Sequence, residues 1–282
     1  MLLKYNIMED QKTWFITGAS KGLGLILTKK LLELGNKVAA TSRNIKAFED
    51  LTLKYGNKFL PLDVNLSSDD SVSKAVQIAA DKLSGIDVVV NNAGYSLVGS
   101  MEELTDQEFR KTLDVNLFGT VNVIRAVMPF FRKQNSGHII NISSNAGYVG
   151  FANATSYNAA KFAVVGLSEA LAEEVKQFGI KVTVVAPGQF RTSFMDSLQY
   201  AQNKIPVYKL AEAEASWKEF SGKQVGNPEK LADMIIGLPG YSNPPVHLLA
   251  GPDTWELVKA HRAKEAAEFE AWKTITLSTD FN

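Results

Sequence analysis

The chain has 282 residues, 45% of them hydrophobic, and its 30 Lys and Arg residues balance 30 Asp and Glu residues. A net charge of zero gives no support to nucleic acid or an anionic membrane as a partner, because such binding needs excess positive charge. The lack of cysteine excludes disulfides, thiol catalysis and thiolate metal sites, and three scattered histidines do not suggest a metal centre.

The first residues, 1–11, contain no apolar run of the length of a signal peptide. No stretch approaches the roughly 20 apolar residues of a membrane span. We therefore expect a cytoplasmic protein with no membrane partner and a disordered leader over residues 1–11. The first strand is expected only at Thr13, so the sequence leaves open whether the chain starts at Met1 or Met8.

Short apolar runs rich in Val and Ile recur along most of the chain. They predict strands at Thr13–Thr17, Lys37–Thr41, Lys58–Leu62, Ile86–Asn91, His138–Ser143, Lys181–Ala186 and Val246–Leu249. These runs lack polar alternation, which is typical of a parallel sheet covered on both faces.

Helical patterns separate the predicted strands. Leucines recur at helical spacing from Leu23 to Leu34, and Gly35 follows where a helix C-terminus favours glycine. Later helix starts are indicated by Ser68, by a capping box of Thr105 and Glu108, and by Asn227 before Pro228. The alternation predicts a single α/β domain over residues 1–282, a Rossmann-like doubly wound parallel sheet of about seven strands flanked by helices.

The junction between the first strand and the first helix contains three glycines, Gly18, Gly22 and Gly24. Glycine allows a sharp turn and a close approach of the backbone to a phosphate, and the helix N-terminus then presents free N–H groups to it. The G-x-x-x-G-x-G spacing differs from the commoner G-x-G-x-x-G. We expect a dinucleotide at this turn, held by Gly18, Ser20, Lys21, Gly22, Leu23 and Gly24.

The second strand ends in Ser42 and Arg43, where an NAD-binding fold usually places a carboxylate for the ribose. With Lys21 in the glycine turn, two cations lie near the expected ribose end, and they favour a 2′-phosphate. The alternative is that both are solvated surface charges. We expect NADP(H).

Tyr157 and Lys161 are four residues apart in a helical pattern, so their side chains share a face. A nearby ammonium lowers the pKa of a phenol, which is otherwise near 10. Ser144, at the end of a predicted strand, is suited to donate a hydrogen bond to a substrate oxygen. Together the three side chains predict proton transfer to or from a carbonyl or alcohol.

With these residues the sequence resembles the short-chain dehydrogenase/reductase family, in its compact single-domain form, from about Thr13 to Thr192. The motifs occur in order: the glycine turn, Asp63-Val64, Asn91-Asn92-Ala93-Gly94, Asn116, Ser144, Tyr157 with Lys161, and Pro187-Gly188 with Thr192. Lys21 and Arg43 match the basic pair of NADPH-preferring members. The resemblance therefore implies an NADP-dependent oxidoreductase that acts on a small carbonyl or alcohol.

The resemblance also implies roles for individual residues. Tyr157 would be the general acid in reduction and the general base in oxidation, and Lys161 would lower its pKa and bind the nicotinamide ribose. Ser144 would polarise the carbonyl, and Asn116 would help place a water that links Lys161 to solvent. The implied cofactor contacts are Asp63 and Val64 at the adenine, Asn91, Ala93 and Gly94 along the dinucleotide, and Pro187, Gly188 and Thr192 at the nicotinamide amide.

Two later segments depart from the strand–helix rhythm. Residues 189–226 are rich in aromatic side chains and predict a substrate lid, the alternative being a pair of helices packed on the domain edge. Residues 253–282 predict a C-terminal helix extension, and family members are commonly dimers or tetramers, so we expect a homo-oligomer. The substrate candidates are Tyr95, Asn145, Tyr148, Phe151, Gln189, Phe190 and Phe194, a set that suggests an apolar carbonyl compound.

Two alternatives to an NADPH-dependent carbonyl reductase or secondary alcohol dehydrogenase stay open. A non-catalytic NADP(H) sensor would typically lack Tyr157 or Lys161, and a nucleotide-sugar epimerase or dehydratase would usually have another glycine spacing and a larger C-terminal part. The sequence does not indicate the physiological substrate, the stereoselectivity, the direction of reaction or the order of the oligomer.

Overall fold

The computed structural model describes residues 11–281. Residues 1–10 and 282 lie outside the described part, and with them almost all of the predicted leader and the choice between Met1 and Met8.

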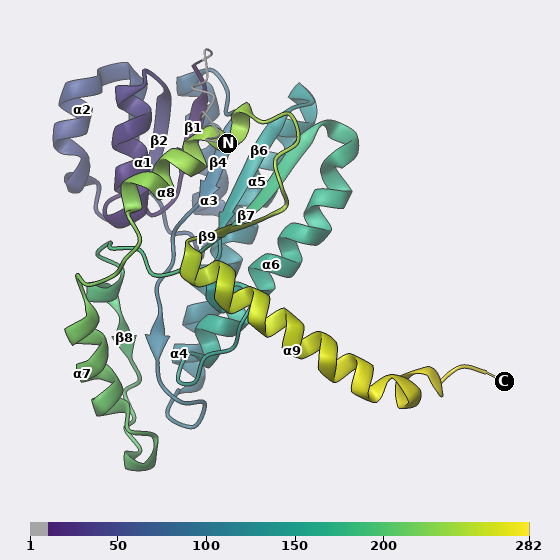
Figure 1. Ribbon diagram of the computed structural model, residues 1–282. Coiled ribbons are helices and arrows are strands. Elements are labelled where there is room, and N and C mark those ends of the chain that lie inside the picture. The colour runs from purple at the N-terminus through teal and green to yellow at the C-terminus, as the bar shows by residue number, and fades with distance from the viewer. Residues whose placement is uncertain (1–10, 282) are drawn as a thin grey trace.

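Seven strands form one parallel sheet in the order β3-β2-β1-β4-β6-β7-β9 (Figure 1). Their bounds are β1 Thr13–Ile16, β2 Lys37–Ser42, β3 Phe59–Asp63, β4 Val88–Asn91, β6 Gly137–Ile142, β7 Ile180–Pro187 and β9 His247–Ala250. Each predicted strand is present, with ends within two residues of those expected. The predicted α/β fold with a seven-stranded parallel sheet is confirmed.

The strands are apolar throughout because both faces of the sheet are covered. Trp14 and Ile16 of β1 belong to the core on one face, and Phe15 between them belongs to the core on the other. The first face is covered by α1 (Gly22–Glu33), α2 (Glu49–Tyr55) and α8 (Pro228–Gly237). The second is covered by α3 (Asp69–Leu83), α5 (Gly119–Gln134) and α6 (Thr155–Val175).

The predicted helix starts have the expected caps. The Ser68 side chain accepts from the N–H of Ser71 at the start of α3, and Asn227 caps α8 with Pro228 in its first turn. Thr105 and Glu108 form a complete capping box at the start of α4 (Asp106–Leu113). A π-helical turn, η3 (Asp114–Phe118), joins α4 to α5. Short helical turns complete the connections: η1 Ile45–Phe48, η2 Gly56–Lys58, η4 Asn145–Gly147, η5 Lys176–Phe178 and η8 Leu238–Gly240.

The segment 189–226, here called the lid segment, forms η6 (Met195–Ser197), β8 (Gln199–Tyr200), η7 (Pro206–Tyr208) and α7 (Leu210–Phe220). The strand β8 pairs in parallel with β5 (Leu97–Val98), a second small sheet that the sequence did not predict. In Figure 1 the lid segment lies below the main sheet, at the end where its strands point.

The C-terminal helix α9 (Pro252–Leu277) packs on the body only through its beginning and then projects away from it (Figure 1). Thr254 and Val258 are buried, whereas Phe269 and Trp272 are exposed. Within residues 11–281, no helix has both the length and the apolar character needed to cross a bilayer.

Candidate active site

The candidate site lies where the strand order reverses. From β1 the sheet extends outward to β2 and β3, and the chain then returns to place β4 on the other side of β1. In open parallel sheets, ligands bind outside the carboxyl ends of the strands at such a switch point. The glycine turn follows β1 here, and residues 92–94 follow β4.

The glycine turn is held against the end of β4. The Nδ2 atom of Asn92 donates to the carbonyl oxygens of Thr17 and Gly18 at 3.0 and 3.1 Å. Gly18 has a φ of +64°, and a Cβ there would lie 2.8 Å from the Cα of Ala93, so the turn accepts only glycine at this position.

The N-terminus of α1 fits an anionic ligand. Lys21 precedes the helix without a side-chain cap, in contrast to the capped starts of α3, α4 and α8. The first N–H groups of α1 therefore have no capping side chain. These free donors, together with the partial positive charge of the helix end, suit a phosphate. Ser20, Gly22, Leu23 and Gly24, the predicted phosphate contacts, belong to this turn.

The residues expected at the ribose and adenine lie at the ends of β2 and β3. Ser42 is buried and its Oγ accepts from the N–H of Asn44, whereas the Arg43 side chain is exposed. Val64 is buried and its N–H donates to the carbonyl of Ser42, next to the exposed Asp63. Lys21 extends to the lid segment, where its Nζ donates to Ser197 Oγ at 2.6 Å.

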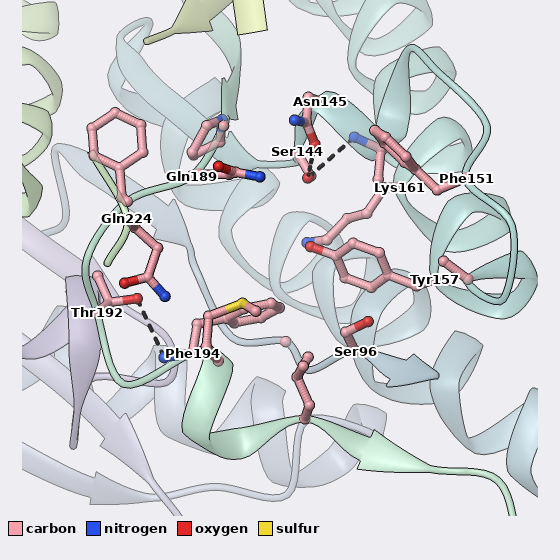
Figure 2. Close-up of a pocket in the computed structure, with 18 of the residues that line it drawn as sticks. Ser96, Ser144, Asn145, Phe151, Tyr157, Lys161, Gln189, Thr192, Phe194 and Gln224 are labelled. Carbon is pink, nitrogen blue, oxygen red and sulfur yellow. Dashed lines mark hydrogen bonds between the residues drawn. The ribbon is translucent and has the colours of Figure 1, made fainter. Parts of the chain in front are cut away.

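Ser144, Tyr157 and Lys161 come together at the carboxyl end of β6 (Figure 2). The Ser144 hydroxyl donates to Asn145 Oδ1 and accepts from the N–H of Ala146. Lys161 Nζ donates to the Ile142 carbonyl at 2.8 Å and lies 5.6 Å from the centroid of the Tyr157 ring.

Asn116 is held in the π-helical turn by both ends of its amide. Its Oδ1 accepts from Tyr95 N and its Nδ2 donates to Tyr95 O. A Cβ at Gly94 would lie 2.9 Å from Asn116 Oδ1 and 3.5 Å from Lys161 Nζ, so glycine leaves this gap free. Single π-turns of this kind are frequent at functional sites.

Burial dominates the proton affinities of the two central groups. It raises the pKa of Tyr157 to about 12, and the neighbouring Ser144 hydroxyl acts in the opposite direction. Burial lowers the pKa of Lys161 to about 8. The net shift of the Tyr157 pKa is therefore upward, and the phenol is protonated at neutral pH, because withdrawal from water is the largest cause. The lowering of this pKa by Lys161 stays a prediction.

A cavity of about 600 Å³ opens in front of these residues. It is lined by predicted site residues from the glycine turn, the ends of β4, β6 and β7, and the lid segment: Leu23, Gly94, Ser144, Asn145, Phe151, Tyr157, Lys161, Pro187, Gly188, Gln189, Phe190, Thr192 and Phe194. The ring centroids of Phe194 and Tyr157 are 6.1 Å apart, so the lid segment contacts the candidate proton donor. We call this space the main cavity.

Three further predicted site residues do not line the main cavity. The Tyr148 hydroxyl is hydrogen-bonded to His247 Nδ1 at 2.6 Å within a separate apolar cluster, and the Tyr95 hydroxyl contacts Thr112. Asn91 is buried in the sheet, where its Nδ2 donates to Asn141. Within residues 11–281, no group of three or more His, Cys, Asp or Glu side chains is placed to hold a metal ion.

The family model for short chain dehydrogenases matches residues 12–203. The chain belongs to the short-chain dehydrogenase family. One relative is Oxidoreductase BOA17 of Botryotinia fuckeliana, which is 37% identical over 95% of this chain and 99% of that protein. Another is 3-ketodihydrosphingosine reductase of Bacteroides thetaiotaomicron, which is 38% identical over 84% of this chain and 87% of that protein.

Solved structures of this family have the same fold. A short-chain dehydrogenase from Streptomyces avermitilis is 30% identical, with a TM-score of 0.89 over 96% of this chain and 100% of that one. ElxO with NADP bound is 26% identical, with a TM-score of 0.72 over 86% and 97%. A 3-ketoacyl-(acyl-carrier-protein) reductase from Brucella melitensis complexed with NADH is also 26% identical, with a TM-score of 0.72 over 85% and 96%.

Three residues of this short-chain dehydrogenase were not selected as site residues from the sequence. Asn92 holds the glycine turn through its side chain, and its position in the Asn-Asn-Ala-Gly motif is the sequence feature that indicates this role. Ser143 donates from Oγ to the Lys161 carbonyl and so ties β6 to α6. Gln224 lines the main cavity from the lid segment, and no local pattern distinguishes it from a surface glutamine.

Proposed function

We propose that this short-chain dehydrogenase is an NADPH-dependent reductase of apolar ketones or aldehydes in which Tyr157 donates the proton. The observation that carries the proposal is the meeting of Ser144, Tyr157 and Lys161 in one cavity that continues to the glycine turn. When bound, the dinucleotide supplies the hydride. The remaining work of positioning, polarising and protonating the substrate oxygen falls to side chains of the chain itself.

The charge at the ribose end supports NADP(H). Ser42 ends β2 and Arg43 follows it, where a carboxylate would select NAD, and Lys21 adds a second cation in the glycine turn. The solved relatives include one with NADP and one with NADH, so fold alone does not choose between the cofactors. We assign the ribose phosphate to Arg43 and Lys21.

The raised pKa of Tyr157 supports its role as the general acid of a reduction at neutral pH. A phenol with a pKa of about 12 retains its proton and is a competent acid, whereas its phenolate is too scarce to be an efficient base. The Ser144 hydroxyl, beside the phenol, is suited to bind the same oxygen as it gains negative charge. Lys161 is suited to bind the ribose and Asn116 to hold a water on the path to solvent. One relative is likewise named as a reductase of a 3-keto compound.

The walls of the main cavity support an uncharged, apolar substrate. Aromatic side chains line it from the loop after β6 and from the lid segment: Phe151, Phe190, Phe194, Trp217 and Phe220. Its charged lining residues are Lys161 and Asp253, and each already has a partner, the Ile142 carbonyl and the N–H of Gln189. Lys161 is the one cation among these lining residues, and the proposal assigns it to the nicotinamide ribose, so a substrate carboxylate or phosphate would have no cation of its own there.

The test uses the purified chain, NADPH, NADH and a panel of ketones, aldehydes and secondary alcohols. We expect carbonyl-dependent oxidation of NADPH, and we expect Tyr157→Phe to lose about 1,000-fold or more in kcat with little change in the Kd of NADPH. A wild-type chain that binds NADPH and turns over nothing would favour the sensor alternative. Retained turnover in Tyr157→Phe would remove the assignment of the proton donor.

We also propose that the lid segment closes over bound substrate and that the chain self-associates as a dimer or tetramer. The contact between Phe194 and Tyr157 supports the first proposal. Exposed aromatic side chains at Phe118 and Phe162 and along α9 support the second. Light scattering of the purified chain measures the number of subunits.

A further inference from the structure

The segment that joins α7 to α8 runs beside the segment that follows β7. The N–H of Gly226 donates to Gln189 O at 2.9 Å, the N–H of Arg191 donates to Gly226 O at 3.0 Å, and Arg191 Nε donates to Gln224 O at 3.1 Å. Neighbouring side chains of this segment point in opposite directions: Val225 is 79% exposed and Gln224 only 1%. The backbone pairing therefore turns Gln224 inward, to the main cavity.

The carboxamide of Gln224 is unpaired. Within the described part of the chain, neither its Oε1 nor its Nε2 has a hydrogen-bond partner. A buried amide in this state has lost its hydration without compensation, and buried polar groups in folded proteins nearly always have a protein, water or ligand partner. Figure 2 shows the carboxamide directed into the cavity beside Thr192, on the opposite side from Ser144 and Tyr157.

The two free atoms define the chemistry of the partner. Nε2 needs an acceptor and Oε1 needs a donor at the same place, and a second primary carboxamide satisfies both at once. A ketone or aldehyde offers only an acceptor, and its oxygen belongs at Ser144 and Tyr157 across the cavity. The nicotinamide ring carries a primary carboxamide, and Thr192, beside Gln224, belongs to the segment expected to bind it.

We propose that Gln224 forms a paired amide–amide contact with the carboxamide of the nicotinamide ring and so positions the ring in front of Tyr157. The inference rests on the proposed binding of NADP(H) at the glycine turn. Since Gln224 belongs to the lid segment, the contact also couples the lid segment to the bound cofactor.

The experiment measures nucleotide binding in the absence of substrate. Gln224→Met retains the length of the side chain and removes both polar atoms, and the exposed Gln202→Met in the same segment is the matched control. The ligands are NADPH and its reduced 3-acetylpyridine analogue, which retains the ring C=O and lacks the amide N–H. We expect wild type to bind NADPH roughly tenfold more tightly than the analogue, and Gln224→Met to lose this difference. The melting temperature of the free Gln224→Met chain should equal or exceed that of wild type.

Several results would overturn the assignment. If Gln224→Met retains the wild-type preference for NADPH over the analogue, Gln224 does not contact the carboxamide. If it binds NADPH normally but raises the KM of the carbonyl compound, Gln224 belongs to the substrate. A lower melting temperature of the free variant, not seen with Gln202→Met, would show a purely structural role. Failure of wild type to bind either nucleotide defeats the proposed function itself, whereas normal NADPH binding without discrimination defeats only the role of Gln224.

Discussion

The Nζ atom of Lys21 lies 2.6 Å from the Oγ atom of Ser197, so a cation of the glycine turn directly contacts the lid segment. Ser197 Oγ in turn donates to the Ser193 carbonyl at 2.7 Å, which leaves the serine oxygen free to accept from the lysine. The proposed function gives the same ammonium a second partner, the ribose phosphate of NADPH.

Substitution of Lys21 separates these two roles. We expect Lys21→Met to weaken NADPH by about tenfold and NADH much less, because only NADPH carries the extra phosphate. Ser197→Ala, which removes the contact with the lid segment but no charge, should leave the ratio of the two dissociation constants unchanged. Equal losses for NADPH and NADH in Lys21→Met would place the ammonium at the shared pyrophosphate instead. Fluorescence titration of both variants gives the four constants.

A substitution of Arg43 tests the cofactor preference directly. Its exposed side chain follows the end of β2, where the ribose phosphate is expected. Arg43→Asp replaces attraction for the 2′-phosphate by repulsion and restores a carboxylate where NAD-binding folds have one. We expect the ratio of kcat/KM for NADPH to that for NADH to fall by about 100-fold. Lys54→Asp, the same charge change on α2, is the control and should leave the ratio unchanged. If both variants behave alike, only net charge matters and Arg43 has no specific role.

The pKa values of Tyr157 and Lys161 predict different pH profiles for the two directions. Reduction needs the phenol, which is fully protonated well below its pKa of about 12, and the Lys161 ammonium, which is lost as the pH rises through about 8. Reductive kcat/KM should therefore be level below pH 8 and fall above it. Oxidation needs the phenolate, so it should increase about tenfold per pH unit up to pH 8 and level off when Lys161 loses its charge. A reductive rate that increases through pH 8 would contradict this assignment.

Glu103 anchors the lid segment from the body of the protein. Its buried carboxylate accepts from Ser100 N, from Ser100 Oγ and, across 102 residues, from Ile205 N at 2.9 Å. Glu103→Ala leaves these donors unpaired, so we expect a loss of about 1–3 kcal/mol in the free energy of unfolding and faster proteolysis within residues 189–226. Glu102→Ala is the matched control, because its carboxylate is exposed and, among residues 11–281, accepts only from the Tyr208 hydroxyl. Similar proteolysis of both variants would mean that the anchor lies elsewhere.

The main sheet and the site motifs could be predicted because their signals are local. Each strand of the main sheet is an apolar run bounded by polar or glycine residues, and the caps at Ser68, Thr105 and Asn227 act within a few residues. The spacing of Tyr157 and Lys161 likewise placed them on one helix face. A parallel sheet then brings the ends of distant strands to one edge without further information.

The parts that could not be predicted depend on contacts between distant residues. β5 and β8 have two residues each and pair across about a hundred positions, so neither has a strand pattern of its own. The direction of the Tyr157 pKa shift depends on the burial of its side chain, which spacing does not reveal. Gln224 stands between Lys223 and Val225 in an ordinary polar stretch, and only the pairing of its backbone beside Arg191 turns it inward.

The parallel pairing of Leu97 with Gln199 and of Val98 with Tyr200 has a consequence for how the chain acquires new substrates. Replacing an aromatic lining residue by a smaller one would widen the cavity, but it would not move the paired main chains of β5 and β8. Because Val98 and the neighbouring Leu198 line the main cavity, we expect a substrate that extends past this pair of strands to break the main-chain hydrogen bonds between them, a cost that no single aromatic side chain sets. Selection for longer substrates would therefore act on insertions or register shifts near these two short strands, and selection for wider ones on the aromatic side chains.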